Sequence, residues 1–484
     1  MRRTLIILAV ALTVVALFWA EADFWVDHRF SLGHHFHSTT ILTSLRVAHR
    51  GEIELDEAQT RIVSMSPDAF LEVGERRFLT RRRLEVRPDA AGRPQYKLTR
   101  GSRERSEEDA REFLALVMED VVHSTTIGAH ARARRILDSE GLDGLLEEVA
   151  RLDSNSARRI YIEIATSAEG LGEEGAARIV RTAGREMTSS SRLRSALVFM
   201  AETFPADWAI TGALIEAAEN IASSSAKGQT LIELVRIRGL EIEDAPAMAE
   251  ALSTIASGGE IVRAVQRITR LAPAPEIVEQ MLEPVSRLSS SSYRRQALEE
   301  LISYPGLSES TYWRALELSR DIASSGERAA FLGALAGKMP EVEGLQRHYL
   351  EVAGGIASSG DQASALTALL RGAAVSEELC RMWIQTAGQV SSSGTAASLL
   401  SQASRRCPDS EGVWSAYLEA VREIPSSGDQ RRALMALLER EGLDPRVIEE
   451  VVSVAESAMA SSGESQRVTD RAQSLLDDRS APKD

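Results

Sequence analysis

The sequence repeats itself with a period of about 34 residues. The string Ile-Ala-Ser-Ser-Gly stands at residues 322–326 and again at residues 356–360. It belongs to a longer series, because an apolar residue followed by a serine cluster occurs ten times at steps of 33 to 35 residues. These apolar positions, called anchors below, are Leu152, Met187, Ile221, Ile255, Leu288, Ile322, Ile356, Val390, Ile424 and Met459. A fixed period of this length indicates a repeat protein in which every unit is one supersecondary element.

A second pattern lies inside each unit. An aliphatic residue stands ten positions after each of the first nine anchors, and another apolar residue follows three positions later, as in Leu332 and Leu335. Apolar residues at i and i+3 mark one buried stripe of a helix. The tenth unit has Thr469 in place of the first of these, which is typical of a terminal repeat that faces solvent. The period therefore describes packed helices.

The serines open helices in this interpretation. Ser324 is followed three residues later by Glu327, and Ser358 by Asp361, which is the spacing of a capping box. The same spacing recurs in Ser426 with Asp429 and in Ser461 with Glu464. No histidine or lysine recurs beside the serines to act as a base, so we interpret them as caps and not as catalytic or phosphorylated residues.

These patterns predict a mainly α fold. Each unit would be a hairpin of two helices of about 12–15 residues, too short to bury its apolar face alone, so neighbouring units must stack. We expect a right-handed αα-superhelix of about ten hairpins over residues 151–476, followed by a disordered tail at 477–484. The chain resembles the αα-solenoids of the tetratricopeptide and HEAT class. It lacks the tetratricopeptide consensus Trp-x2-Leu-Gly-x2-Tyr.

Residues 41–105 have a different pattern, in which Val, Ile, Leu and Phe alternate with charged residues. Alternation of this kind indicates an antiparallel sheet with one solvated face, so we expect a small β-rich domain. Ser106, followed by three acidic residues, begins a helix because acids favour the positive end of the helix dipole. We assign residues 106–150 to a helical connector.

The N-terminus predicts export. Arg2 and Arg3 precede an uncharged apolar run over residues 4–20, and acidic residues follow it. Such a segment places the amino end in the cytoplasm and the rest of the chain outside it. We expect residues 1–22 to be an uncleaved signal anchor in the cell membrane. The alternative is a signal peptide that is cleaved near Ala22, which would give a secreted protein.

Two clusters near this segment are candidate ligand sites. Residues 23–40 are rich in histidine, and His34, His35 and His37 are candidate metal ligands, although a solvated spacer explains them as well. Residues 76–105 hold eleven basic and three acidic residues. The arginines of this stretch would face anionic lipid headgroups near the anchor, or would only solvate a strand. They are Arg76, Arg77, Arg81, Arg82 and Arg83.

Six aromatic residues form a third candidate site, because all of them fall 21 to 27 residues after their anchor. They would line a groove that binds a peptide or helix of a protein partner. The alternative is that they fill the core between units. The residues are Trp208, Trp313, Tyr349, Trp383, Trp414 and Tyr417.

Composition and motifs exclude several functions. The formal net charge is −15, which disfavours nucleic acid as the partner. The two cysteines, Cys380 and Cys407, are too few for a zinc site, and we expect two buried free thiols, although a single bridge would be possible in an oxidising compartment. There is no phosphate-binding loop, no Gly-x-Ser-x-Gly and no dinucleotide fingerprint, so we expect no enzyme and no cofactor.

The strings Gly-Glu-Ile-Glu-Leu at 51–55 and Arg-Arg-Arg-Leu-Glu-Val-Arg-Pro at 81–88, followed by the serine-turn units, carry a second resemblance. Over residues 44–484 the chain is similar to a cassette fused to some bacterial membrane zinc-peptidase antirepressors. The resemblance implies a sensory accessory role without catalysis, because no His-Glu-x-x-His is present. Two functions are thus expected: a protein-binding scaffold at the cell envelope, or an extracytoplasmic module that senses metal or anionic lipid.

Overall fold

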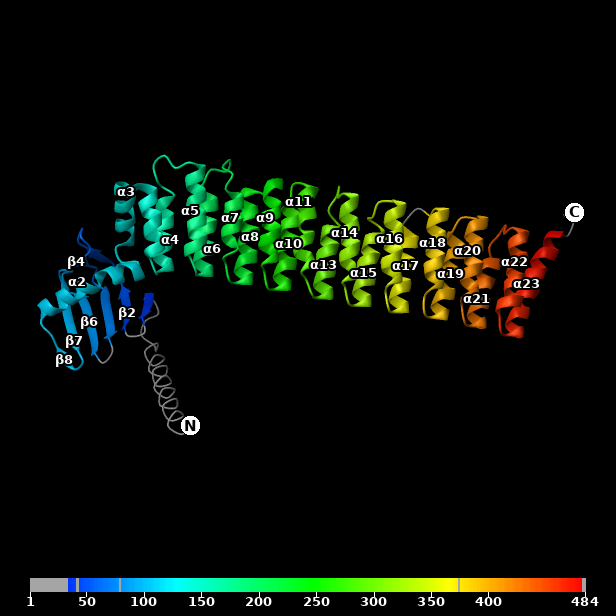
Figure 1. Ribbon diagram of the computed structural model, residues 1–484, viewed down its shortest axis with the longest axis horizontal. Helices are drawn as coiled ribbons and strands as arrows, with labels where there is room; N and C mark the ends of the chain where they lie inside the picture. The colour runs from blue at the N-terminus through cyan, green and yellow to red at the C-terminus, as the bar shows by residue number, and fades with distance from the viewer. Residues whose placement is uncertain (1–33, 41–42, 78–79, 373–374, 481–484) are drawn as a thin grey trace, which may run out of the picture. The chain divides into compact units, whose positions relative to one another are not determined.

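The protein is mainly α-helical, with a small antiparallel sheet domain that precedes a helical array (Figure 1). The computed structural model describes residues 34–40, 43–77, 80–372 and 375–480. The chain divides into two compact units, residues 1–192 and 193–484, and each is described by itself. Within the described residues, every helix is too short or too polar to cross a bilayer, and the expected anchor at 4–20 lies outside them.

A six-stranded antiparallel sheet opens the first unit, in the order β1-β2-β5-β6-β7-β8. A separate hairpin pairs β3 with β4. The strands are β1 (His34–Thr40), β2 (Thr43–Arg50), β3 (Ile53–Leu55), β4 (Ile62–Met65), β5 (Phe70–Arg77), β6 (Thr80–Pro88), β7 (Pro94–Arg100) and β8 (Arg103–Glu104). The β-rich segment is therefore confirmed, but it begins earlier than predicted. Its first strand occupies part of the expected histidine-rich spacer, since β1 pairs along its whole length with β2.

One face of the sheet packs on the helix α2 (Glu107–Ser124). Val47, Val73 and Leu84 point to this side and are at most 1% exposed, and they share a core with Phe113 and Val117 of the helix. The structure therefore places α2 in the sheet domain and not in a connector. The helix begins as predicted, because Ser106 and Asp109 form a capping box in which each side chain accepts from the other residue's backbone N–H.

The connection from β2 to β3 requires a glycine at residue 51. Gly51 has a φ of +73°, which L-residues with side chains rarely adopt. A Cβ at this position would lie 2.7 Å from the Cα of Ala69. The tight connection between β2 and β3 therefore depends on the missing side chain.

Three helices complete the first unit: α3 (Ala129–Arg151), α4 (Asn155–Ala165) and α5 (Glu173–Glu186). A buried polar cluster joins α2, α3 and α4. The His123 Nε2 lies 3.0 Å from the Glu148 Oε1, and the hydrogen bond from this histidine is the main cause that lowers the pKa of Glu148. Arg132 of α3 donates to the Val122 carbonyl at 2.9 Å and to the Tyr161 hydroxyl.

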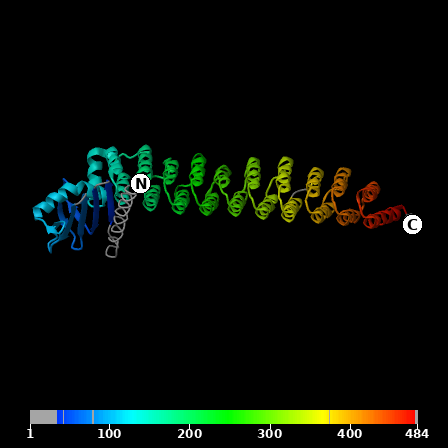
Figure 2. The ribbon, with the colours of Figure 1, turned by 60° about the horizontal axis from the view of Figure 1, so that its bottom comes forward.

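The second unit stacks its helices in two layers (Figure 2). In each repeat, the helix that precedes the serine turn ends one to three residues before the anchor, and we call it the before-turn helix. The helix that begins after the serine turn is called the after-turn helix. The before-turn helices are α7 (Thr211–Ala218), α9 (Ala245–Ser253), the split pair α11 (Pro275–Gln280) and α12 (Leu282–Ser286), α14 (Glu309–Arg320), α16 (Glu343–Gly354), α18 (Glu377–Gly388), α20 (Glu411–Arg422) and α22 (Pro445–Ala458). The after-turn helices are α8 (Ser224–Arg238), α10 (Gly258–Leu271), α13 (Ser291–Leu301), α15 (Ser325–Ala336), α17 (Ser359–Gly372), α19 (Ser393–Arg406), α21 (Ser427–Leu438) and α23 (Ser462–Ser480), while α6 (Ser190–Thr203) spans the division.

The predicted repeat core is confirmed. All ten anchors are buried, and Met459 is the most exposed of them at 8%. The residues ten positions after the first nine anchors are all fully buried, as Leu332 is, and those at thirteen positions are at most 1% exposed. Thr469 of the last unit is half-buried, as expected of a terminal repeat. The period thus identified the stripe along which the units pack.

Candidate partner-binding surfaces

The serine turns start helices as predicted, but only half of the expected capping box forms there. The Ser324 hydroxyl accepts from the Glu327 backbone N–H at 3.4 Å. The Glu327 carboxylate does not return the bond; it accepts from Arg295 of the preceding unit. The Ser324 N–H donates instead to the Ser291 hydroxyl, also of the preceding unit, at 3.2 Å. The second arm of the motif therefore joins adjacent units.

A polar side chain six residues after the anchor closes many of these turns, and sequence reasoning missed it. Arg328 donates to the Arg320 carbonyl at 2.7 Å and to the Ile322 carbonyl at 2.9 Å. Gln362 donates to the Gly354 carbonyl at 3.3 Å. Carbonyl groups at a helix end have no partner inside their helix, so these donors satisfy them. Aligning the units by their period would have revealed the pattern: Arg158, Lys227, Arg294, Arg328, Gln362 and Gln430.

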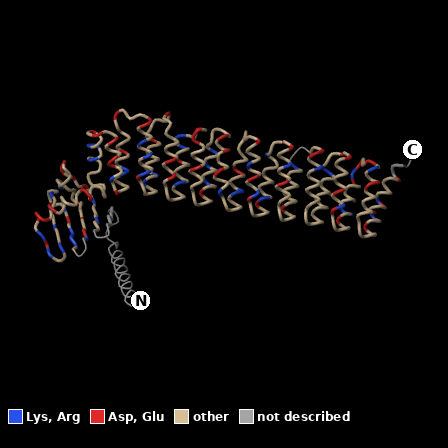
Figure 3. Tube along the Cα trace, in the orientation of Figure 1, with Lys and Arg blue, Asp and Glu red and all other residues tan. Residues whose placement is uncertain are grey.

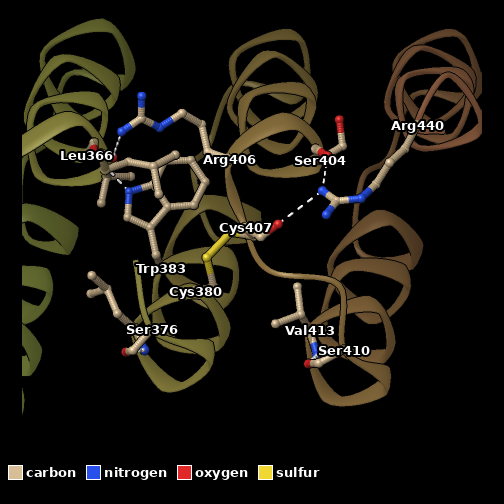
Figure 4. The surroundings of a disulfide bond; sticks show 12 residues. Leu366, Ser376, Cys380, Trp383, Ser404, Arg406, Cys407, Ser410, Val413 and Arg440 are labelled. Atoms are coloured by element: carbon tan, nitrogen blue, oxygen red, sulfur yellow. Dashed lines mark hydrogen bonds between the residues drawn. A yellow bond between two sulfur atoms is a disulfide. The ribbon is translucent and has the colours of Figure 1, made fainter. Parts of the chain in front are cut away.

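Four of the six aromatic residues fill the core, so the predicted aromatic groove is wrong for them. Trp383, Tyr349 and Tyr417 are fully buried and Trp414 is 1% exposed. Their polar atoms are used internally. The Trp383 indole donates to the Leu366 carbonyl at 2.7 Å (Figure 4), and the Tyr349 hydroxyl lies 3.0 Å from the Leu332 carbonyl. These side chains pack between helices and offer no surface to a partner.

The other two aromatic residues, Trp208 and Trp313, are half-buried. The Trp313 ring stacks on His348 of the next before-turn helix, with 4.4 Å between the ring centroids. Trp208 stacks on Phe204 at 5.8 Å. Trp208 lies between α6 and α7 and Trp313 lies on α14, and only these two remain of the predicted groove.

Cys380 and Cys407 form a disulfide, so the expectation of free thiols is wrong (Figure 4). Cys380 lies in α18, and Cys407 directly follows the last residue of α19. The bond connects a before-turn helix to the after-turn helix that follows it. Arg440 of the next unit donates to the Cys407 carbonyl at 3.0 Å. The spacing of 27 residues gave no indication of this pairing, because it depends on how the helices pack.

Charge is segregated between the two layers of the second unit. Its before-turn helices carry 16 acidic and 6 basic residues. The after-turn helices that lie wholly within the unit carry 11 acidic and 17 basic residues. We call the layer of before-turn helices the acidic layer and the layer of after-turn helices the basic layer. The net charge of −15 calculated for the whole sequence conceals this division.

A row of exposed glutamates runs along the acidic layer. They occur on six of the eight before-turn positions of the second unit, 28 or 29 residues after the anchor, while α22 has Ser453 there. We call them the glutamate row: Glu216, Glu250, Glu283, Glu317, Glu351 and Glu419. The helix between the last two has Gln385 at this position. In the middle of the row, the His348 ring lies 2.6 Å from Glu317 and 3.3 Å from Glu351.

A groove with a volume of about 560 Å³ opens beside this row, between α18 and α20. Glu419, Glu423 and Gln385 line it, together with small side chains and the next serine turn. Gly388 lets the helices approach closely, because a Cβ there would lie 2.9 Å from the Ala420 Cβ. The groove thus combines two carboxylates with a floor of small residues.

The free face of the sheet is basic. In the strand register, residues that alternate with the buried ones share one face, which we call the outer face. It carries seven basic residues: Arg46, Arg50, Arg76, Arg81, Arg83, Arg87 and Lys97. The described acidic residues on it are Glu72, Glu85 and Glu104. Several of these charges are visible along the strands in Figure 3.

The predicted lipid-facing arginines do not form a single patch. Arg76, Arg81 and Arg83 share the outer face, and Arg83 forms ion pairs with Glu72 and Glu85. Arg82 lies on the opposite face, where its guanidinium is 5.3 Å from the Phe113 ring centroid, so the prediction is wrong for this residue. Arg77 lies opposite Thr80 at the end of β5. Sequence reasoning missed the basic residues of β2 and β7.

The histidine candidates remain untested as metal ligands. His34, His35 and His37 belong to β1, but the placement of their side chains lies outside the described structure. Among the residues that the structure does describe, no group of three or more His, Cys, Asp or Glu side chains could hold a metal ion.

These features define a class: a helical-repeat protein with a small antiparallel sheet domain. No family matches the sequence, and no curated protein does. Two solved repeat structures align with it. One, from "Computational Design of Self-Assembling Cyclic Protein Homooligomers", is 15% identical over 71% of this chain and 98% of that chain, with a TM-score of 0.11. The other, a "Circular tandem repeat protein with novel repeat topology and enhanced subunit contact surfaces", is 14% identical over 77% and 79%, with a TM-score of 0.15. With such scores neither likeness supports an inference.

Proposed function

We propose that this protein is a non-enzymatic scaffold of the cell envelope, exported and held by its N-terminal segment, whose helical array binds a protein partner. The segregation of charge between the layers carries the proposal. A long acidic surface with periodic carboxylates is complementary to a partner that presents lysine or arginine at matching intervals. The groove beside Glu419 offers a hollow in this surface for a basic side chain.

The glutamate row supports binding because helix stability does not explain it. Acids at the start of the before-turn helices, such as Glu309 and Glu343, favour the positive end of the helix dipole. Glu250 and Glu419 of the row lie in the last turn of their helices, where the dipole disfavours a negative charge, and no ion pair to either is found among the described residues. A charge that recurs where folding disfavours it is better explained by a partner.

The disulfide supports the proposed location of the array outside the cytoplasm. Disulfides persist in oxidising compartments and are rare in the cytosol. The Cys380–Cys407 bond is therefore consistent with the export predicted from residues 1–22. Alkaline phosphatase fused after residue 100 tests this, because that enzyme needs the oxidising side of the membrane. An inactive fusion at full expression would overturn the exported location, and fractionation distinguishes an anchor from a cleaved signal.

Partner binding is tested by removing charge without changing shape. The variant changes Glu216, Glu250 and Glu419 to Gln, three members of the row for which no ion pair is found among the described residues. Cross-linked complexes of the full chain should lose a salt-sensitive protein partner in this variant. Circular dichroism checks that both proteins are folded.

A matched control changes three exposed acids of the after-turn side, Glu202→Gln, Glu439→Gln and Asp470→Asn. It removes the same number of charges and should retain the partner. Equal loss in both variants would mean that only the net charge matters. Retention of the partner by the glutamate-row variant would refute binding at the acidic layer.

A further inference from the structure

The outer face of the sheet is a flat basic surface on the side opposite α2. Arg46, Arg76, Arg81 and Arg87 come from three neighbouring strands, and the register places them on this face. Counting all described residues of the face, seven basic and three acidic groups leave four net positive charges. The Arg87 guanidinium also lies 5.9 Å from the Phe70 ring centroid on the same side.

The exposure of this face makes its charges accessible. Arg50, Arg76, Arg81, Arg87 and Lys97 are all exposed, although Arg50 forms an ion pair with Asp68 beside the face and Lys97 one with Glu104. Helix α2 covers the other face with apolar residues, so the two sides of the sheet have opposite character. Guanidinium groups bind phosphate oxygens through pairs of parallel hydrogen bonds, which suits a surface of phosphate headgroups.

The short segment between the expected anchor and β1 limits how far the sheet domain can lie from the membrane. Residues 21–33 connect the expected anchor to β1, and 13 residues span at most about 45 Å. An anchored chain therefore keeps the sheet domain close to the bilayer. Each lysine or arginine near an anionic membrane surface adds about 1 kcal/mol of attraction, so several together produce stable contact.

We propose that the outer face of the sheet docks on anionic lipid headgroups of the membrane that holds the chain. The proposal rests on the anchoring proposed above and adds a specific contact to it. The headgroup phosphates meet Arg46, Arg81 and Arg87, while α2 faces away from the bilayer. The sheet domain is then held at the membrane surface by two signals, an apolar segment and a basic face.

The experiment uses the full chain in vesicles that contain nitroxide-labelled lipid. A fluorophore on Gln95→Cys reports the outer face, and one on Leu116→Cys reports the exposed side of α2. The native cysteines are bonded to each other, so labelling is specific. We expect quenching at residue 95 in vesicles with phosphatidylglycerol, none in purely phosphatidylcholine vesicles, and none at residue 116 in either.

Charge reversal tests whether the named residues cause the contact. Arg46, Arg81 and Arg87 are changed together to Glu, and a milder variant changes them to Gln in case the reversed protein does not fold. Quenching at residue 95 should disappear in either folded variant. Three exposed arginines off the outer face, Arg103, Arg105 and Arg134, changed to the same residues, serve as the control and should leave quenching intact.

The outcomes distinguish a failure of the basic-face proposal from a failure of the proposed anchoring. If fractionation shows a soluble chain, the labelled protein is added to preformed vesicles, and binding that depends on anionic lipid still supports the basic face. Absence of quenching, or equal loss in the control, would overturn the proposal. Self-association that disappears with the reversed arginines and occurs without lipid would also overturn it, since the face would then bind a second copy.

Discussion

The disulfide between Cys380 and Cys407 should stabilise two helices of the array by a predictable amount. The perturbation is Cys380→Ala with Cys407→Ala, because both residues are buried and serine would add an unpaired polar group. The bond closes a loop of 27 residues. In the chain-entropy account, a loop of this length gives about 3.5 kcal/mol, between the values for 15 and 100 residues.

Hydrogen exchange is the suitable assay, because repeat arrays open unit by unit and a single melting temperature averages over them. Loss of about 3.5 kcal/mol should speed exchange of the most protected amides of α18 and α19 by a few hundred-fold. The helices α8 and α10, far along the chain, serve as an internal reference and should not change. Unchanged exchange in α18 and α19, or equal acceleration in α8 and α10, would refute the reasoning.

Three single substitutions test contacts elsewhere in the chain. Arg328→Met removes the guanidinium donors to helix-end carbonyls but keeps the aliphatic stem, and hydrogen exchange of α15 should show a loss of local stability of about 1.5–3 kcal/mol; no loss would mean that water replaces them. Tyr349→Phe removes a buried hydroxyl that lies within hydrogen-bond distance of the Leu332 and Ala365 carbonyls and should lower the local stability of α16 by about 1 kcal/mol in hydrogen exchange, whereas unchanged exchange would contradict that role. The His123 contact lowers the pKa of Glu148, so this carboxylate stabilises the fold above its ordinary pKa of 4.5, and the contribution is lost as the pH falls through the lowered value. Glu148→Gln should therefore be less stable than the parent protein near neutral pH, and the difference in unfolding free energy should shrink in acid; a constant difference at all pH values would rule this out.

The sequence predicted the repeat core well because packing places the same demand on every unit. Leu332 and its equivalents face the neighbouring helices at each step, so an aliphatic residue recurs at each step. The strands were predictable for a similar reason, since the buried face of the sheet requires alternation. Because the same packing requirement recurs in every unit, the same type of residue recurs in the sequence.

Which side of a helix a residue occupies was harder to predict than the presence of the helix. Five of the six aromatic residues lie on before-turn helices, whereas Trp208 lies between α6 and α7. On those helices the side was not predicted: Tyr349 points inward while Glu351, two residues later, points to solvent. Two residues turn a helix by about 200°. The range of 21 to 27 residues after the anchor, by which the aromatic residues were grouped, therefore includes both the buried and the exposed side of a helix. Aligning the single position of the glutamate row would have found this surface.

The sheet provides a comparable case. Arg81, Arg82 and Arg83 are consecutive, and successive residues of a strand point to opposite faces, so they could not form one patch. Strand parity alone would have excluded Arg82 and included Arg87. The disulfide was different, because the contact of Cys380 with Cys407 depends on the packing of α18 against α19 and no local pattern encodes it.

The glutamate row has an energetic consequence for the folded chain. Packed helices lie about 8–10 Å apart, so neighbouring carboxylates of the row repel by about 0.5 kcal/mol in water before salt reduces it. The chain offsets part of this in the middle of the row, where Arg320 contacts both Glu317 and Glu351. For Glu216 and Glu250 no ion pair is found among the described residues. At the other end of the row, Gln385 and Ser453 stand on the helices beside Glu419, so this carboxylate has no neighbour of the row to repel it. Repulsion that is left uncompensated between Glu216 and Glu250 therefore favours a basic partner most strongly at the N-terminal end of the acidic layer.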